Sequence, residues 1–174
     1  MKILETERLY LRKFSINDEE HLFKLNLDED VIKYTGDSAF KSVEEAKIFL
    51  ENYNHYQLYG FGRWAVIDKK SEEFLGWCGL KFSEELNEVD LGFRFFRKYW
   101  NKGFATESSL ACLKFGFSEL NLDKIVGRAM LANQASIKVL EKIGMQFVAE
   151  INFELHKGVL FQIKKTDNAH SRNL

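Results

Sequence analysis

The stretch YWNKGFATES occupies residues 99–108 of a chain of 174 residues. Two small residues, Gly103 and Ala105, flank Phe104 directly before a segment with helical character. The first N–H groups of a helix have no partner inside the helix, and they lie at the positive end of its dipole. A helix start of this kind binds phosphate when no side chain blocks the approach. The stretch therefore predicts an anion site, with a tight turn that needs glycine for positive φ as the alternative.

Basic residues gather beside this stretch. Arg94, Arg97, Lys98 and Lys102 fall within RFFRKYWNK, which contains no acidic residue. Because the whole chain has a net charge of −1, the cluster is a local concentration of positive charge that favours a phosphate ligand. Its alternative is an ordinary solvated face. Neither GxxxxGK[ST] nor GxGxxG is present, and the balanced charge without a basic, aromatic stripe predicts no nucleic-acid partner.

Hydrophobic periodicity divides the remaining sequence into strands and helices. Strands are predicted at 3–14, 63–68, 74–82, 88–96, 123–131, 147–155 and 159–165. Helices are predicted at 16–27, 42–59, 105–119 and 133–144. Asn17 or Asp18 would cap the first helix, Ser42 with Glu45 would form a capping box on the second, and Gly144 would end the last. The polar turn KKSEE predicts a hairpin between the second and third strands, and the fourth strand is expected to pair antiparallel with the third.

This order of elements predicts one α/β domain over residues 1–165, with a mixed, mostly antiparallel sheet flanked by helices. The polar segment 166–174 is expected to be a frayed tail. Cys78 and Cys112 lie among apolar residues without metal or redox spacing, so we expect core residues and a cytoplasmic protein. No apolar run is long enough to span a membrane, and the four histidines form no cluster, so neither membrane nor metal is expected. A monomer or a homodimer is compatible with the sequence.

Three segments together resemble the GNAT N-acetyltransferase family, in particular its RimJ/RimL-like branch. TERLYLRKF resembles the opening strand of that branch. DLGFRFFRKYWNKGFATES resembles the fourth strand and the loop that binds the pyrophosphate of coenzyme A, and NQASIKVLEKIGM resembles the second cofactor motif. The resemblance covers nearly the whole chain, and it implies a GNAT-type sheet whose fourth and fifth strands splay apart to hold acetyl-CoA.

The resemblance also implies which residues bind acetyl-CoA, the expected cosubstrate. The pyrophosphate would take the backbone N–H groups of Lys102 to Thr106, and the pantetheine arm would run along Phe93 to Phe95 and reach Asn133. The full set of expected cofactor-binding residues is Phe93, Arg94, Phe95, Arg97, Lys98, Lys102, Gly103, Phe104, Ala105, Thr106, Asn133 and Ser136. Asn133 would equally serve as an N-cap.

Two departures from the common family pattern concern the chemistry. Trp100 stands where many members have Gln or Arg, a replacement that the RimJ/RimL-like branch shares. Leu140 stands where many members place a Tyr that protonates the leaving thiolate, and in this branch Ser136 is thought to serve instead. Ser136 would equally cap its own helix.

The implied reaction is direct attack of a primary amine on the thioester, without a covalent enzyme intermediate. Asp90 is the first candidate for the base that takes the amine proton, acting through a water, and Glu154 and Glu150 are alternatives. A backbone N–H near Phe93 would polarise the thioester carbonyl.

The acceptor is expected to be a small amine or a protein N-terminus. Residues 34–40, residues 53–64 and the terminal hairpin would frame its groove. The acidic residues Asp28, Glu29, Asp30 and Asp37 are a hypothesis for attraction of a cationic acceptor. The alternative function is a catalytically silent domain that binds acyl-CoA or a partner.

Overall fold

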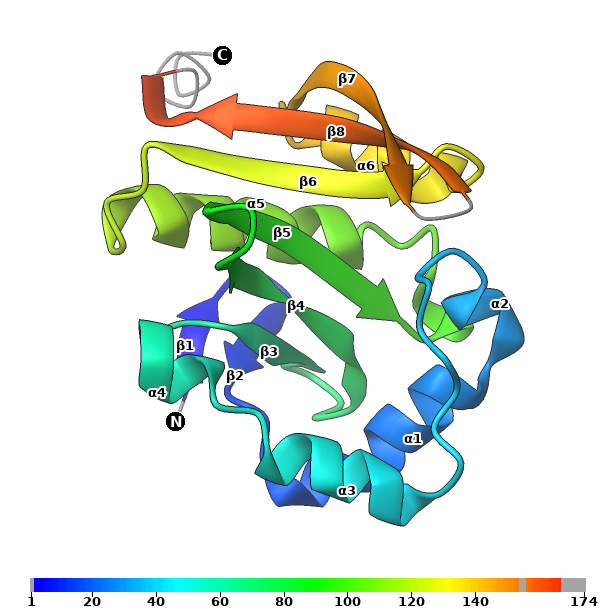
Figure 1. Ribbon diagram of the computed structural model, residues 1–174. Helices are drawn as coiled ribbons and strands as arrows, with labels where there is room; N and C mark the ends of the chain where they lie inside the picture. Colours follow the sequence, from blue (N-terminus) through cyan, green and yellow to red (C-terminus); the bar gives the residue numbers. More distant parts are fainter. Residues whose placement is uncertain (1, 154–155, 167–174) are drawn as a thin grey trace.

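The computed structural model describes residues 2–153 and 156–166 and contains one sheet of eight strands. The strands are β1 (Lys2–Glu5), β2 (Leu9–Arg12), β3 (Arg63–Asp68), β4 (Phe74–Ser83), β5 (Glu88–Phe95), β6 (Lys124–Met130), β7 (Gln146–Phe153) and β8 (His156–Lys164). Their order across the sheet is β1-β2-β3-β4-β5-β6-β8-β7. Only the pair β5–β6 is parallel among these strands. The predicted mixed, mostly antiparallel sheet is confirmed (Figure 1).

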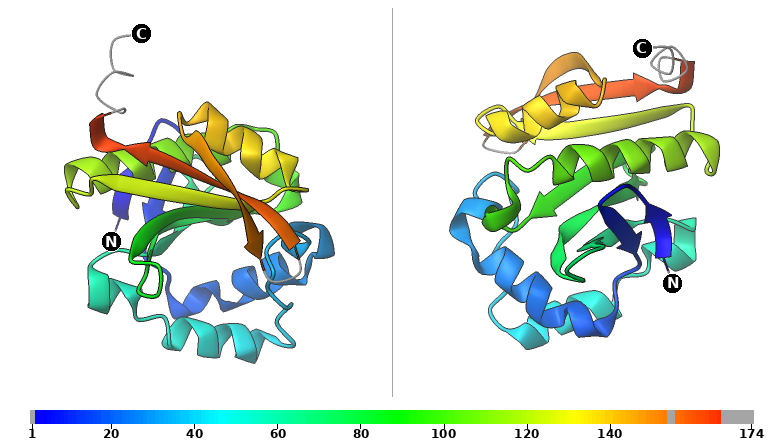
Figure 2. Two further views of the ribbon diagram at one scale, coloured as in Figure 1. Left: turned by 45° about the horizontal axis from the view of Figure 1, so that its top comes forward. Right: turned by 180° about the vertical axis from the view of Figure 1, so that it is seen from behind.

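Helices cover both faces of the sheet (Figures 1 and 2). They are η1 (Ile16–Asp18), α1 (Glu19–Leu27), α2 (Glu29–Ile32), α3 (Val43–Glu51), α4 (His55–Tyr59), η2 (Arg97–Tyr99), α5 (Phe104–Ser118) and α6 (Gln134–Lys142). The larger core packs α5 and α6 against one face, and a smaller core packs α1, α2 and α3 against β3 and β4 on the other. No helix of the described residues is long and apolar enough to cross a membrane.

Strand β3 shows how the sequence fills both cores. Trp64 and Val66 belong to the core under α5, while Ala65 and Ile67 belong to the core under α1 and α3. Successive side chains of a strand point to opposite faces, so a strand covered on both faces is apolar at every position. The short run WAVI is therefore the pattern expected for a central strand.

Two predicted elements are each divided in the structure. The predicted strand 3–14 is the hairpin β1–β2, which reverses where the Thr6 hydroxyl accepts the N–H of Leu9 at 3.0 Å. The predicted helix 42–59 is interrupted after α3, where the Asn52 side chain donates to the carbonyl of Ile48 at 2.8 Å and caps the helix. Both corrections have the same cause, a side chain that bonds the backbone locally instead of continuing the element.

The predicted helix caps are confirmed in part. The Ser42 hydroxyl accepts the N–H of Glu45 as expected, but the Glu45 carboxylate accepts the N–H of Lys41 and closes no capping box. Asp18 precedes α1 but makes no cap bond there, because its carboxylate is buried and ion-paired with Arg12. Gly144 follows α6 with φ of +85° and ends that helix as predicted. The predicted tail lies outside the described residues except for Thr166.

Candidate functional site

The sheet opens between β5 and β6. Only two residue pairs join these strands, Asp90 with Val126 and Leu91 with Gly127. Beyond them β5 continues to Phe95 and β6 to Met130, and the two strands diverge (Figure 1). Within residues 2–153 and 156–166, the backbone edge of residues 92–95 that faces β6 has no strand paired to it. The splayed fourth and fifth strands of the predicted fold correspond to this gap.

The N-terminus of α5 lies just beyond the end of β5, after η2 and a short loop. Gly103 precedes the helix with φ of +81°, a left-handed backbone that strongly favours glycine. The first intrahelical bond runs from the N–H of Glu107 to the carbonyl of Gly103 at 2.9 Å. The N–H groups of residues 104–106 have no partner in the described part of the chain. The turn therefore favours glycine at position 103, as the structural alternative expected, and the three N–H groups that follow it are unpaired in the described residues.

Arg8 and Glu107 hold this loop in place. The Glu107 carboxylate accepts from the Thr6 hydroxyl at 2.5 Å, from the backbone N–H of Arg8 at 2.9 Å and from Arg8 Nε at 2.6 Å. Arg8 also donates to the carbonyl of Lys102 at 3.0 Å, and its guanidinium lies 4.4 Å from the centre of the Phe104 ring. Burial alone would raise the pKa of Glu107, but the hydrogen bonds from Thr6 and Arg8 outweigh it and hold that pKa below its usual value. The β1–β2 turn is thereby tied to the start of α5.

The basic cluster predicted beside the loop is mostly paired with acidic residues. Arg94 contacts Asp37, Lys98 contacts Glu73 at 3.2 Å, and Arg97 pairs with both Asp28 and Asp30, 2.9 Å and 2.5 Å away. A phosphate would therefore have to exchange with these carboxylates in order to bind the side chain of Arg94, Arg97 or Lys98.

The acidic residues proposed to attract a cationic acceptor take part in the same contacts. Asp28, Asp30 and Asp37 are the partners in those ion pairs, so only Glu29 of that set has no ion-pair partner among the described residues.

Lys102 is the member of the basic cluster that has no ion pair in the described residues, and its ammonium lies 5.7 Å from the centre of the Tyr99 ring. Of the basic cluster, Lys102 is thus the one left available to an anion at the loop.

The second cofactor motif begins α6 at the end of β6. Asn133 is the N-cap of α6 and accepts the N–H of Ser136 at 3.2 Å, which confirms the prediction that it would serve as an N-cap. Both side chains are half-buried, at the β6 side of the gap. Leu140 is only 2% exposed and packs in the core, whereas Trp100 is exposed and donates from Nε1 to the carbonyl of Phe95 at 2.8 Å. Trp100 therefore fastens the loop to the end of β5.

Asp90 lies on the face of β5 opposite α5, where Arg63 reaches it. Arg63 Nη2 donates to the Asp90 carboxylate at 2.5 Å, and Nη1 donates to the Asp90 carbonyl at 3.0 Å. Arg63, Gly79 and Gly92 form one row across β3, β4 and β5. A Cβ at Gly92 would lie 2.6 Å from Arg63 Nη2, so the glycine clears the path of this side chain. Of the alternative carboxylates, Glu150 is exposed on β7 and Glu154 lies outside the described residues.

A cavity of about 280 Å³ opens on this same face of the sheet. Its lining residues are Phe14, Leu22, Asn26, Asp37, Ser38, Phe40, Phe49, Tyr53, Arg63, Trp77 and Arg94. Members of both segments expected to frame an acceptor groove, 34–40 and 53–64, are among them. Arg94 brings the cavity to the diverging part of β5.

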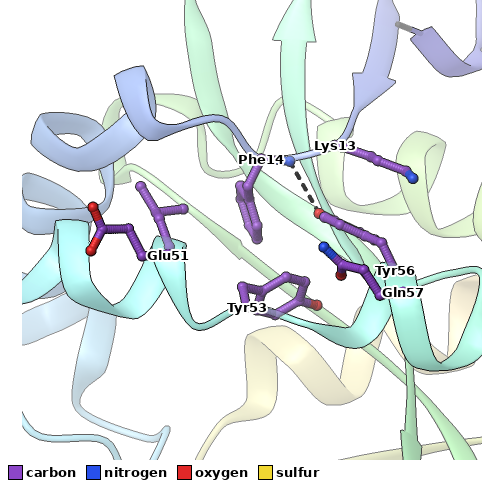
Figure 3. A pocket seen from close by; sticks show the side chains of 7 residues that line it. Lys13, Phe14, Glu51, Tyr53, Tyr56 and Gln57 are labelled. Atoms are coloured by element: carbon purple, nitrogen blue, oxygen red, sulfur yellow. Dashed lines mark hydrogen bonds between the residues drawn. The ribbon is translucent and has the colours of Figure 1, made fainter.

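A second hollow, of about 310 Å³, lies next to this cavity and shares Phe14 and Tyr53 with it (Figure 3). Tyr56 accepts the N–H of Phe14 at 3.1 Å, drawn as the dashed line in Figure 3, and donates to the carbonyl of Arg63. Tyr53 accepts the N–H of Arg63 at 2.7 Å. Burial raises the pKa of Tyr56 far above its usual value. The two phenols therefore fix the backbone of Arg63, which lines the neighbouring cavity.

The two cysteines are core residues, as predicted. Cys78 and Cys112 are both fully buried, and their sulfurs lie 3.7 Å apart across the contact between β4 and α5. Burial raises the pKa of the Cys112 thiol, which makes it a poor nucleophile. In the residues that the structure describes, no group of three His, Cys, Asp or Glu side chains is arranged to hold a metal ion.

Three residues of the site, Arg8, Trp77 and Glu107, were missed from the sequence, and Arg63 was expected only as part of the segment 53–64. Each acts through a partner distant in the chain, 27 residues away for Arg63 and Asp90 and 99 for Arg8 and Glu107. No local pattern reports such pairs. The sole signal for Glu107 was its place in the first helical turn after Gly103, where a carboxylate interacts favourably with the helix dipole.

The gap, the open helix start and the adjacent cavity agree with the comparisons. Residues 8–146 match the acetyltransferase (GNAT) domain family. "Uncharacterized N-acetyltransferase p20" of Bacillus licheniformis is 32% identical over 166 residues, covering 94% of this chain and 93% of that protein. A GNAT-family acetyltransferase structure from Bacillus anthracis matches with a TM-score of 0.84 at 28% identity, covering 95% of this chain and 99% of that one. Spermidine N-acetyltransferase from Vibrio cholerae, in complex with CoA and spermine, has a TM-score of 0.79 at 19% identity and covers 94% and 99%. The chain belongs to the GNAT acetyltransferase family.

Proposed function

We propose that this protein transfers the acetyl group of acetyl-CoA to a primary amine by direct attack in a ternary complex. The observation that carries the proposal is the continuity of the β5–β6 gap with the unpaired N–H groups of α5. Together they provide an unpaired strand edge for an amide-containing chain and an anion site at its end. The solved spermidine N-acetyltransferase binds CoA and spermine on the same fold.

In this proposal the backbone N–H groups of 102–106 hold the pyrophosphate, with Lys102 as the adjacent cation. The free edge of Phe93 to Phe95 holds the pantetheine arm, and Asn133 reaches it from the other side of the gap. Bound acetyl-CoA supplies the acetyl group as a thioester. Arg94, Arg97 and Lys98 would contact the cofactor through their side chains only by exchanging their carboxylate partners.

The chain's own groups then move the protons. Asp90, oriented by Arg63, accepts the first proton of the substrate ammonium through a water, the freed amine forms the new C–N bond, and the second proton on its nitrogen then leaves to solvent through the same water. A backbone N–H near Phe93 stabilises the oxyanion. As the C–S bond breaks, the Ser136 hydroxyl donates its proton to the thiolate and is reprotonated from solvent. Leu140 offers no acid, which leaves this step to Ser136.

Within the family we assign the chain to the RimJ/RimL-like branch, on Trp100 and on Ser136 in place of a tyrosine acid. Acceptors in that branch are protein N-terminal amines and small amines. The cavity of about 280 Å³ has the size for a small acceptor or for the first side chain of a peptide.

The experiment is release of the CoA thiol measured with acetyl-CoA and a panel of small amines and peptides. Wild type should turn over at least one acceptor, and Ser136→Ala should lower kcat by about tenfold or more with little change in the KM for acetyl-CoA. Ser118→Ala is the matched control, since Ser118 lies at the far end of α5. Tight acetyl-CoA binding without transfer to any amine would instead favour the catalytically silent acyl-CoA-binding domain.

A further inference from the structure

Two arginines meet at one tryptophan in the wall of the cavity. The guanidinium carbons of Arg63 and Arg94 lie 5.5 Å and 5.3 Å from the centre of the Trp77 ring. Arg94 faces Trp77 directly across β4 and β5, and the Arg63 row is the next one along. The side chains of Arg63 and Arg94 are only 14% and 9% exposed, so both cations are fixed in the wall. This arrangement stabilises positive charge where an acceptor would bind.

Arg94 is incompletely satisfied. Its Nη1 donates to Asn26 and its Nη2 to one oxygen of Asp37. Its Nε is buried and has no hydrogen-bond partner among the described residues. Nε and Nη2 lie along one edge of the guanidinium, and that edge matches the two oxygens of a single carboxylate. Asp37 therefore fills half of a bidentate carboxylate site.

Asp37 differs from the arginine in being exchangeable. Its side chain is 55% exposed and comes from the loop between α2 and α3, whereas Arg94 is held on a central strand. An exposed carboxylate that makes one bond with a buried guanidinium is readily replaced by a ligand carboxylate that makes two. The remaining wall is mostly apolar, formed by Phe14, Leu22, Phe40 and Phe49 together with Ser38 and Tyr53.

We propose that the acceptor is an amino carboxylate with an apolar side group, bound by its carboxylate to the Nε–Nη2 edge of Arg94 in place of Asp37. This inference rests on the proposed function and names its substrate class. The bonds made and broken are those of the transfer described above. The aromatic wall takes the apolar group.

The first test needs only wild-type protein and three acceptors that differ at one group: L-phenylalanine, L-phenylalaninamide and phenethylamine. Thiol release gives KM and kcat for each at fixed pH, and calorimetry on CoA-saturated protein gives their affinities. The KM and Kd of phenylalanine should lie about tenfold or more below those of both analogues that lack the carboxylate, as expected for charge-assisted hydrogen bonds. Equal or weaker binding of phenylalanine overturns the inference. Transfer to phenethylamine alone would overturn the inference and leave the proposed function intact. If no acceptor is turned over, binding that does not depend on the carboxylate would still overturn the inference.

Variants then assign the preference to Arg94. Arg94→Gln should abolish the preference for the carboxylate, while Lys81→Gln, which removes an exposed cation from the same sheet face outside the cavity, should keep it. Arg94→Lys covers the case in which Arg94→Gln does not fold, and it should retain only part of the preference. Asp37→Asn should lower the KM of phenylalanine, because a competitor is weakened. A raised KM for all three amines in Asp37→Asn would make Asp37 the amine partner and overturn the proposal.

Discussion

Replacing Glu107 by Gln should destabilise the protein by about 2 kcal/mol. The carboxylate receives three hydrogen bonds, from Thr6, the backbone of Arg8 and Arg8 Nε, and its side chain is 19% exposed. A hydrogen bond to a charged group contributes about 1.5–3 kcal/mol. The Arg8 bond counts for less, because that side chain is 42% exposed, and glutamine keeps one acceptor oxygen. For a chain of this size, about 2 kcal/mol corresponds to a fall in Tm of about 4–8 °C.

The pH dependence of this loss follows from the lowered pKa of Glu107. A carboxyl whose pKa is lower in the folded than in the unfolded state stabilises the protein above its unfolded pKa and loses that effect as pH falls through the folded pKa. The difference in unfolding free energy between wild type and Glu107→Gln should therefore be full at pH 7 and should shrink as the pH falls below about 4.

Thermal and urea unfolding of wild type and Glu107→Gln, at pH 7 and at a pH below about 4, measure this difference in unfolding free energy. Glu44→Gln is the matched control, because Glu44 lies in the first turn of α3 but has no side-chain partner among the described residues. It should change stability by less than about 0.5 kcal/mol. A loss for Glu107→Gln no larger than that of Glu44→Gln would refute the idea that Glu107 ties the β1–β2 turn to α5.

Three further changes test other parts of the account. Asp18→Asn should cost about 3 kcal/mol in urea unfolding, because it leaves Arg12 without its buried carboxylate; a cost below about 1 kcal/mol would show that the pair contributes little. Leu140→Ala should cost about 2–5 kcal/mol in the same assay and leave the KM for acetyl-CoA near that of wild type, since the side chain is 2% exposed in the core; a changed KM with unchanged stability would contradict this. Asp90→Asn should lower kcat about a hundredfold in the thiol-release assay, and a kcat near that of wild type would leave Asp90 only the role of holding Arg63.

The sequence predicted most of the fold because periodicity and turn chemistry are local. The hairpin of β3 and β4 and the glycine that ends α6 were visible in neighbouring residues. The β1–β2 reversal at Thr6 was missed, since β1 is half-exposed and shows no clear alternation. The break after α3 was missed because Asn52 signals its cap only through a side-chain bond.

The candidate site was predictable where it depends on backbone and not where it depends on side chains from distant strands. Gly103 before α5 indicated the open amides directly. The charges of Arg94 and Arg97, by contrast, are used by Asp37, Asp28 and Asp30, which precede them by dozens of residues and face them only in the folded chain. A cluster of like charges in sequence is therefore a weak guide to free charge in space.

The most direct test of the central claim is acetyl-CoA binding measured by calorimetry for wild type, Gly103→Glu and Gly60→Glu. Both glycines have left-handed φ, +81° and +79°, so both variants carry a comparable backbone strain, although a Cβ at Gly103 would lie 3.3 Å from Arg8 Nη2 and one at Gly60 would meet no atom within 4 Å. Only Gly103→Glu places a negative side chain beside the open N–H groups of α5. The account predicts that wild type and Gly60→Glu bind acetyl-CoA and that Gly103→Glu binds at least about tenfold more weakly. Wild type that binds no CoA thioester, or equal binding by Gly103→Glu and Gly60→Glu, would contradict it.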